Sequence, residues 1–119
     1  MHELSLAMSV VDFLKQLSKE KGLTKVEAVY LEVGDMAYVD PAQLRYSFKI
    51  ASQGTVAEKS RLYIKRRKVV LRCTKCGREN EFRLESLSDF RWKCPCCGSP
   101  DVEIDKGKEL LLKRVKGSR

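Results

Sequence analysis

Residues 73–77 read CTKCG, and residues 94–98 read CPCCG. Each segment holds two cysteines in C-x-x-C spacing followed by a glycine, which allows the tight turn that such a pair needs. Seventeen residues lie between Cys76 and Cys94, a spacing typical of zinc ribbons. Because each pair directs two sulfurs to one point, the two pairs together predict a tetrahedral four-thiolate site that suits Zn²⁺.

The predicted zinc ligands are those with C-x-x-C spacing, namely Cys73, Cys76, Cys94 and Cys97. Four protein ligands leave no open position, so we expect the Zn(II) to be structural and not catalytic. Disulfides are disfavoured by the cytosolic composition, and a redox-active pair usually occurs in a βαβ context that is absent here. An iron–sulfur centre on the same thiolates is the remaining alternative.

The fifth cysteine, Cys96, lies inside the second pair. Because Cys94 and Cys97 already have the required spacing, we expect Cys96 to be a spectator. Exchange of Cys97 for Cys96 at the metal would give C-x-C, which is a poorer geometry for two ligands. The sequence leaves this exchange open.

Length and composition narrow the class of protein. The chain has 119 residues and a net charge of +8, with 43% hydrophobic residues, which suits one domain or one domain with a small insert. Its longest apolar runs are far shorter than the roughly 20 residues that span a membrane, and the pattern of the first residues leads us to expect no signal peptide. These features exclude membrane, disordered and disulfide-scaffold classes, and we expect a cytoplasmic protein.

The hydrophobic periodicity predicts an α+β fold. Apolar residues recur every three to four positions in two segments and alternate in three others. Asp40, Pro41 and Gln43 provide a helix start of the capping-box kind. We expect helices over 3–21 and 40–53, and a small three-stranded sheet from 25–33, 61–67 and 109–115.

The segment that carries the cysteines falls between the last two predicted strands. We expect one α/β domain made of residues 1–68 and 106–119, and an inserted zinc-ribbon domain of residues 69–105 with rubredoxin-like knuckles. The insert has few long apolar runs, so a metal and not a core should hold it together. The final residues, 116–119, are expected to be mobile.

The start of the chain, Met1-His2-Glu3, has a chemistry that no interior segment has. The free α-amine, the His2 backbone nitrogen and the imidazole can close fused chelate rings on one ion, and Glu3 adds a further backbone nitrogen. Four nitrogens in a plane are typical of Ni(II) or Cu(II) sites. From the residues alone, an exposed terminal histidine without a function is the competing interpretation.

The charge distribution suggests a second hypothesis. Residues 1–60 carry a net charge of −1 and residues 61–119 a net charge of +9. The run KRRK at 65–68 could bind nucleic acid, as in a nucleic-acid-binding zinc ribbon. The competing interpretation is that these four basic residues form a solvated strand end and connector. Zinc with four thiolates lowers the net charge to about +6, which weakens the nucleic-acid hypothesis. A thiol redox role for Cys96 is a third hypothesis.

Several stretches together resemble the HypA family. They are MHELSLA at 1–7, LEVGD at 31–35, DPAQLRYSF at 40–48, GTVAE at 54–58, the two cysteine motifs, and GKEL at 107–110. The resemblance runs from residue 1 to about residue 115. The zinc motif alone occurs in many unrelated proteins, whereas its combination with the Met-His-Glu start is specific.

The resemblance implies a nickel metallochaperone and not an enzyme. In this family Ni(II) is the transported ion, held by His2 with the Met1 amine and the Glu3 backbone, and Zn(II) is structural. The expected partners are a HypB-type GTPase and the hydrogenase large-subunit precursor, with urease as a further target in some organisms. Nucleic acid and membrane are not expected partners, and the sequence does not distinguish a monomer from a dimer.

Overall fold

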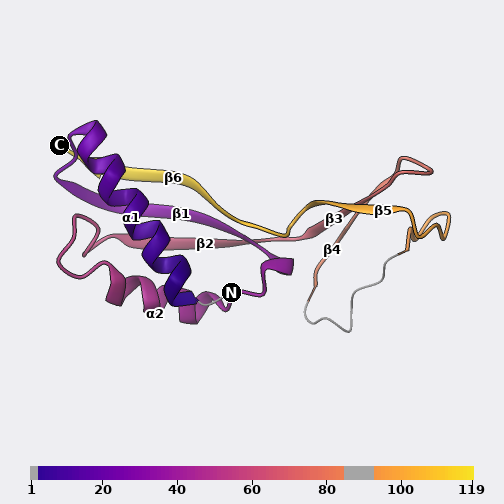
Figure 1. Ribbon diagram of the computed structural model, residues 1–119, viewed down its shortest axis with the longest axis horizontal. Coiled ribbons are helices and arrows are strands. Elements are labelled where there is room, and N and C mark those ends of the chain that lie inside the picture. Colours follow the sequence, from indigo (N-terminus) through magenta and orange to yellow (C-terminus); the bar gives the residue numbers. More distant parts are fainter. Residues whose placement is uncertain (1–2, 85–92) are drawn as a thin grey trace. The chain divides into compact units, whose positions relative to one another are not determined.

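The computed structural model describes residues 3–84 and 93–119, and its class is α+β, as predicted. The helices and strands are drawn in Figure 1. In chain order they are α1 (Glu3–Lys21), β1 (Lys25–Gly34), the short 3₁₀ helix η1 (Asp35–Ala37), α2 (Pro41–Ala51), β2 (Arg61–Arg67), β3 (Val69–Cys73), β4 (Glu79–Phe82), β5 (Val102–Lys106) and β6 (Leu110–Ser118).

The three strands predicted outside the cysteine segment form one sheet, in the order β2-β1-β6. The central strand is therefore the first in the chain, and the last strand of the protein pairs beside it. In Figure 1, α1 crosses over these strands. The apolar periodicity of the sequence thus predicted the members of the sheet, while their order became clear only from the structure.

Two compact units make up the described chain. The first contains residues 3–32, 39–65 and 111–119, and its helices pack against each other. Its core is formed by the apolar stripes of α1 and α2 and by the inward faces of β1 and β2. The buried side chains include Ala7, Val10, Val11, Leu14, Val26, Val29, Leu31, Leu44, Phe48 and Leu62.

The start of α2 confirms Asp40 as the helix cap, but not the capping box with Gln43, because the Asp40 amide donates to the Glu3 carboxylate instead. The Asp40 side chain accepts a hydrogen bond of 2.9 Å from the Ala42 amide, and Pro41 occupies the first helical position. A side-chain acceptor here satisfies one of the amides that a helix start leaves without a partner. The end of the helix at Ala51 comes two residues earlier than predicted.

The prediction of a mobile C-terminal tail is wrong for residues 116–118. Strand β6 continues to Ser118, whose carbonyl accepts a hydrogen bond of 2.8 Å from the Thr24 amide. The absence of a side chain at Gly117 allows the backbones of the two segments to approach closely. A Cβ atom at this position would lie only 2.8 Å from the Lys25 carbonyl oxygen. The polar composition of the tail concealed a strand end that pairs with a distant segment.

The second unit comprises Val33–Tyr38 and, in its described part, residues 66–84 and 93–110. Its sheet has the order β4-β3-β5, with both neighbours antiparallel to β3. The hydrophobic cluster of this sheet contains Val69, Leu71 and Leu84, with Met36, Phe82 and Ile104 packed against it. That a metal holds this segment together stays a prediction.

A buried carboxylate organises one end of the second unit. Asp35 follows β1, and its side chain is fully buried. Its oxygens accept hydrogen bonds from Arg83 and from the Leu84 amide, both at 2.9 Å, and Arg66 lies within 3.1 Å. Because two guanidinium groups and one amide compensate the charge, burial of this carboxylate is tolerated.

The assignment of residues 1–68 and 106–119 to one domain and 69–105 to another stays a prediction, since compact units are not shown to fold independently. Among the described residues, no helix has the length and apolar character needed to cross a membrane.

The close approach of two glycines leads to a testable prediction. Gly34 has an ordinary backbone conformation, with φ −67° and ψ 144°, but a Cβ atom there would collide with the Gly107 backbone. We expect Gly34→Ala to lower the free energy of unfolding by about 3 kcal/mol, because backbone must move to make room. Urea denaturation followed by circular dichroism measures this loss.

Gly54→Ala is the matched control for that measurement. Gly54 has φ +74° and no atom within 4 Å of an added Cβ, so only the backbone conformation is disfavoured, at a cost of about 1 kcal/mol. Equal losses for the two variants would show that the contact between Gly34 and Gly107 does not constrain the fold.

Candidate metal centre

The four cysteines with C-x-x-C spacing come together in the second unit. All four sulfur atoms lie within 4.8 Å of one another. The Cys73 and Cys97 sulfurs are 3.6 Å apart, as are those of Cys76 and Cys94, so each close contact joins one pair to the other. Two motifs separated by seventeen residues therefore form a single cluster.

The two C-x-x-C turns have the same local structure. In each, the glycine after the second cysteine has a positive φ, +77° at Gly77 and +72° at Gly98. Its amide donates to the carbonyl of the first cysteine, at 2.9 Å for Cys73 and 2.8 Å for Cys94. Glycine adopts this conformation without the steric cost that a Cβ brings, which is why the motif ends on glycine.

The turns also direct backbone amides at the first sulfur of each pair. The Cys76 amide lies 3.4 Å from the Cys73 sulfur and, more than any other group, lowers the pKa of that thiol. The amide of Cys97 and then that of Cys96 lower the pKa of Cys94 to about 6. Hydrogen bonds to the charged form of a thiol stabilise the thiolate.

The pKa of the second cysteine of each pair is raised and not lowered. For Cys76 the Arg78 amide favours the thiolate, but desolvation and the neighbouring sulfurs outweigh it and raise the pKa to about 12. The pKa of Cys97 is raised in the same way, against the Ser99 amide. Four thiolates so close together repel one another unless a cation lies between them.

The donor set fits a tetrahedral metal. A metal bound to four sulfurs at about 2.3 Å separates neighbouring sulfurs by about 3.8 Å, close to the shortest contacts of the cluster. All five cysteines are free thiols in the described chain. The cluster can therefore hold one ion of the Zn²⁺ type without a large rearrangement of the two turns.

Cys96 does not belong to the cluster. Its side chain is exposed, and its sulfur lies 3.6 Å from an Arg78 nitrogen. The structure thus separates Cys96 from the other four cysteines. The contact with Arg78 has no signal in the sequence, since the two residues are eighteen positions apart.

Of the predicted nickel ligands, only Glu3 is described, and Met1 and His2 lie outside the described residues. Glu3 is the first residue of α1. One of its carboxylate oxygens accepts a hydrogen bond of 3.2 Å from the Asp40 amide. The sequence indicated Asp40 only as a helix cap, and no local signal could have shown its place beside Glu3, 37 residues away.

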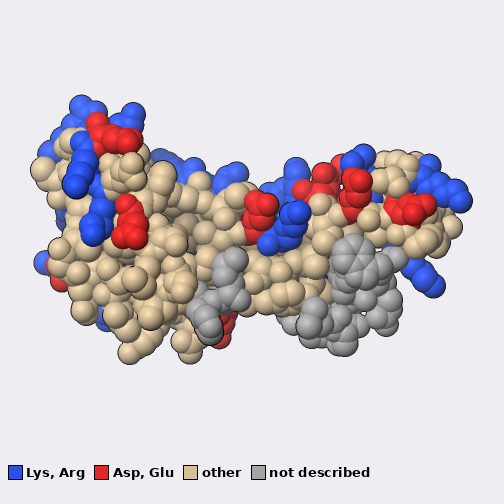
Figure 2. Space-filling view, viewed as in Figure 1, with Lys and Arg blue, Asp and Glu red and all other residues tan. Residues whose placement is uncertain are grey.

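The surface charge was the basis of the nucleic-acid hypothesis. On the face shown in Figure 2, Lys and Arg side chains alternate with Asp and Glu, and wide areas carry no charge. Within the second unit, Arg72 pairs with Glu103 at 2.7 Å and Arg66 with Asp35 at 3.1 Å. Part of the formal positive charge of residues 61–119 is therefore compensated within the fold.

Comparisons with known proteins agree with the resemblance found in the sequence. The family model described as hydrogenase/urease nickel incorporation, metallochaperone, hypA matches residues 1–117. A hydrogenase maturation factor HypA from Methanococcus aeolicus is 33% identical over 97% of this chain and 95% of its own length. A hydrogenase maturation factor HybF from Morganella morganii is 36% identical over 98% and 99% of the two chains.

Solved structures of HypA proteins are also similar to this chain. The solution structure of the Ni metallochaperone HypA from Helicobacter pylori is similar to this chain with a TM-score of 0.71 and 25% identity, over 99% of this chain and 98% of its own. The family is one of metallochaperones, not of enzymes. Since the family model and these relatives match nearly the whole length, the chain belongs to the HypA family of hydrogenase/urease nickel incorporation metallochaperones.

Proposed function

We propose that this protein binds Ni(II) at its N-terminus and delivers it during maturation of NiFe hydrogenase, while a structural Zn(II) holds the second unit together. The observation that carries the proposal is the match to the nickel-incorporation family over residues 1–117, in a chain whose second residue is its one histidine.

Zinc would be held by the four clustered thiolates of Cys73, Cys76, Cys94 and Cys97. The support is that all four sulfur atoms lie within 4.8 Å of one another. A bound divalent ion would neutralise part of the thiolate charge and join the two turns. Four protein ligands leave no position for a substrate, so the role is structural.

Nickel, the cargo, would be held by His2 together with the Met1 amine and the backbone nitrogen of Glu3. The amide of Glu3 lies in the first turn of α1, where amides have no acceptor within the helix. Its coordination would therefore break no helical hydrogen bond. The Glu3 carboxylate already accepts from the Asp40 amide, which favours the backbone of Glu3 over its side chain as ligand.

Membership in this family places the chain within hydrogenase maturation. The proposal extends this to a HypB-type GTPase as partner and the hydrogenase large-subunit precursor as recipient, with urease as a second recipient. It places the protein in the cytoplasm, where thiolates remain reduced and available for metal.

The zinc assignment predicts different effects for neighbouring cysteines. We expect Cys94→Ser to lose most of its zinc and to unfold the second unit, because a structural metal contributes folding free energy. Cys96→Ser, two residues away, should keep about one zinc per chain. Elemental analysis and thermal unfolding of the two purified variants measure this difference, and loss of zinc in Cys96→Ser would contradict the ligand set.

The thiol pKa values predict how zinc uptake depends on pH. In the metal-free protein at neutral pH, Cys76 and Cys97 hold their protons, since both pKa values are raised, whereas Cys94 is largely ionised at a pKa of about 6. Zinc binding should then release at least about two protons, and zinc affinity should fall as pH falls.

Isothermal titration in buffers of different ionisation enthalpy counts the protons released. A heat of zinc binding that is independent of the buffer at neutral pH would contradict the predicted protonation of Cys76 and Cys97.

The nickel assignment predicts that the N-terminus is indispensable. We expect His2→Ala to weaken Ni(II) binding to the zinc-loaded protein at least about tenfold, because the chelate loses its imidazole. A short N-terminal extension that blocks the α-amine should have a similar effect. Calorimetric titration measures affinity, and the d–d absorption spectrum reports the coordination geometry.

Glu3→Gln is the matched control at this site. It keeps the backbone nitrogen and changes only the side chain, so its Ni(II) affinity should remain close to that of the unaltered protein. Undiminished affinity in His2→Ala would refute the proposed nickel site.

A further inference from the structure

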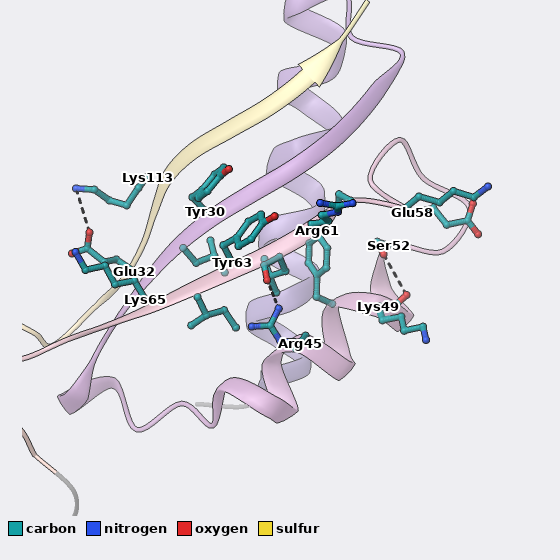
Figure 3. Close-up of a pocket in the computed structure, with 16 residues that line it drawn as sticks. Tyr30, Glu32, Arg45, Lys49, Ser52, Glu58, Arg61, Tyr63, Lys65 and Lys113 are labelled. Carbon is teal, nitrogen blue, oxygen red and sulfur yellow. Dashed lines mark hydrogen bonds and ion pairs between the residues drawn. The ribbon is translucent and has the colours of Figure 1, made fainter.

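A groove of about 720 Å³ lies in the first unit beside β2, an edge strand of the sheet (Figure 3). Its lining comes from α2, from the turn before β2, and from β1, β2 and β6. None of the four clustered cysteines and neither Glu3 nor Asp40 lines it. Neither metal assignment therefore accounts for this groove.

The lining is strongly basic. It contains two acidic residues, Glu32 and Glu58, against six basic ones, namely Arg45, Lys49, Lys59, Arg61, Lys65 and Lys113. Glu32 is buried and lies 4.0 Å from the Lys113 ammonium group. Within the described part of the chain, no carboxylate forms an ion pair with the other five basic side chains. The groove thus presents uncompensated positive charge, which attracts acidic groups.

An aromatic pair contributes to the lining of the groove. The rings of Tyr30 and Tyr63 stack with centroids 4.8 Å apart and an angle of 12° between their planes. The Arg114 guanidinium lies 5.4 Å from the centre of the Tyr30 ring. Tyr63 is 43% exposed although it is held by this stacking. A rigid, exposed aromatic ring is typical of the anchors that dominate binding between proteins.

Arg45 is positioned by a bond to the edge strand. One of its terminal nitrogens donates a hydrogen bond to the Leu62 carbonyl, as Figure 3 shows. A guanidinium group has five N–H donors, so several remain for an incoming carboxylate. Because the group is already held, little side-chain entropy is lost when such a partner binds.

We propose that this groove docks an acidic segment of a partner protein, with carboxylates on the basic rim and an apolar side chain against Tyr63. Both faces of Tyr30 and one face of Tyr63 are already covered, which leaves one open ring face for a single side chain and no row of rings for the successive stacking that single-stranded nucleic acid uses. A protein of a nickel-incorporation family must bind the proteins that receive the nickel, at least for the time of transfer. The docking surface is separate from nickel binding and does not depend on the ligands proposed for it.

Fluorescence anisotropy with the full-length, zinc-loaded protein tests the proposal. The probe is a short fluorescein-labelled peptide in which Glu alternates with Leu, and a peptide with Lys in place of Glu controls for charge. We expect Lys49→Glu/Arg61→Glu to raise the dissociation constant of the acidic peptide at least about tenfold. Tyr63→Ala should also weaken binding, whereas Tyr63→Phe should not, because it keeps the ring.

Lys15→Glu/Lys116→Glu is the matched control, since it makes the same change in net charge on exposed residues of the same unit outside the groove. We expect its affinity to stay within about twofold of the unaltered protein. Equal weakening in both double variants, or no binding of the acidic peptide at all, would overturn the proposal. So would tighter binding of a single-stranded RNA oligonucleotide that is lost in Lys49→Glu/Arg61→Glu.

Nickel titration of the same double variants distinguishes this proposal from the proposed function. Unchanged Ni(II) affinity together with lost peptide binding is the expected result. Lost Ni(II) affinity in Lys49→Glu/Arg61→Glu would show that the groove is not a separate surface.

Discussion

Four sulfur atoms within 4.8 Å of one another set the main constraint on this protein. Among the described residues of the second unit, the buried hydrophobic cluster consists of Val69, Leu71 and Leu84, and small units of this kind commonly rely on a metal for stability. Backbone amides of the turns lower the pKa of Cys73 and Cys94, while desolvation and then the neighbouring sulfurs outweigh the amides at Cys76 and Cys97 and raise the pKa of these two thiols. A cation bound between the sulfurs would stabilise all four thiolates together. The proposed zinc would then contribute folding free energy to the second unit.

The first unit is held together differently. Its helices and sheet bury an ordinary apolar core, and it needs no metal to explain its packing. The proposed nickel site lies at its very start, where α1 begins at Glu3. A carrier must release its cargo, and a terminal site requires few residues to rearrange. The proposed zinc would then be held permanently by the four clustered thiolates, whereas the proposed nickel would be held transiently at the N-terminus.

Local patterns predicted most of the elements. The bounds of α1 and β2 agree with those expected from periodicity, because the repeat of apolar residues reflects directly which face of each element is buried. The error at the C-terminus has an equally physical cause. The pairing of Ser118 with Thr24 joins residues from opposite ends of the chain, and the close approach that Gly117 permits has no counterpart in local composition.

The sequence by itself determined the family, the α+β class and which four of the five cysteines cluster. The cysteine set follows from C-x-x-C spacing within two short segments, the class from local periodicity, and the family from motifs distributed along the chain. Only the tertiary structure decided the strand order β2-β1-β6, the burial of Asp35 beneath Arg66 and Arg83, and the basic groove around Tyr63. These features combine segments that are distant along the chain. Periodicity reports which side of an element is buried, whereas the neighbour that buries it is chosen by packing of the whole unit.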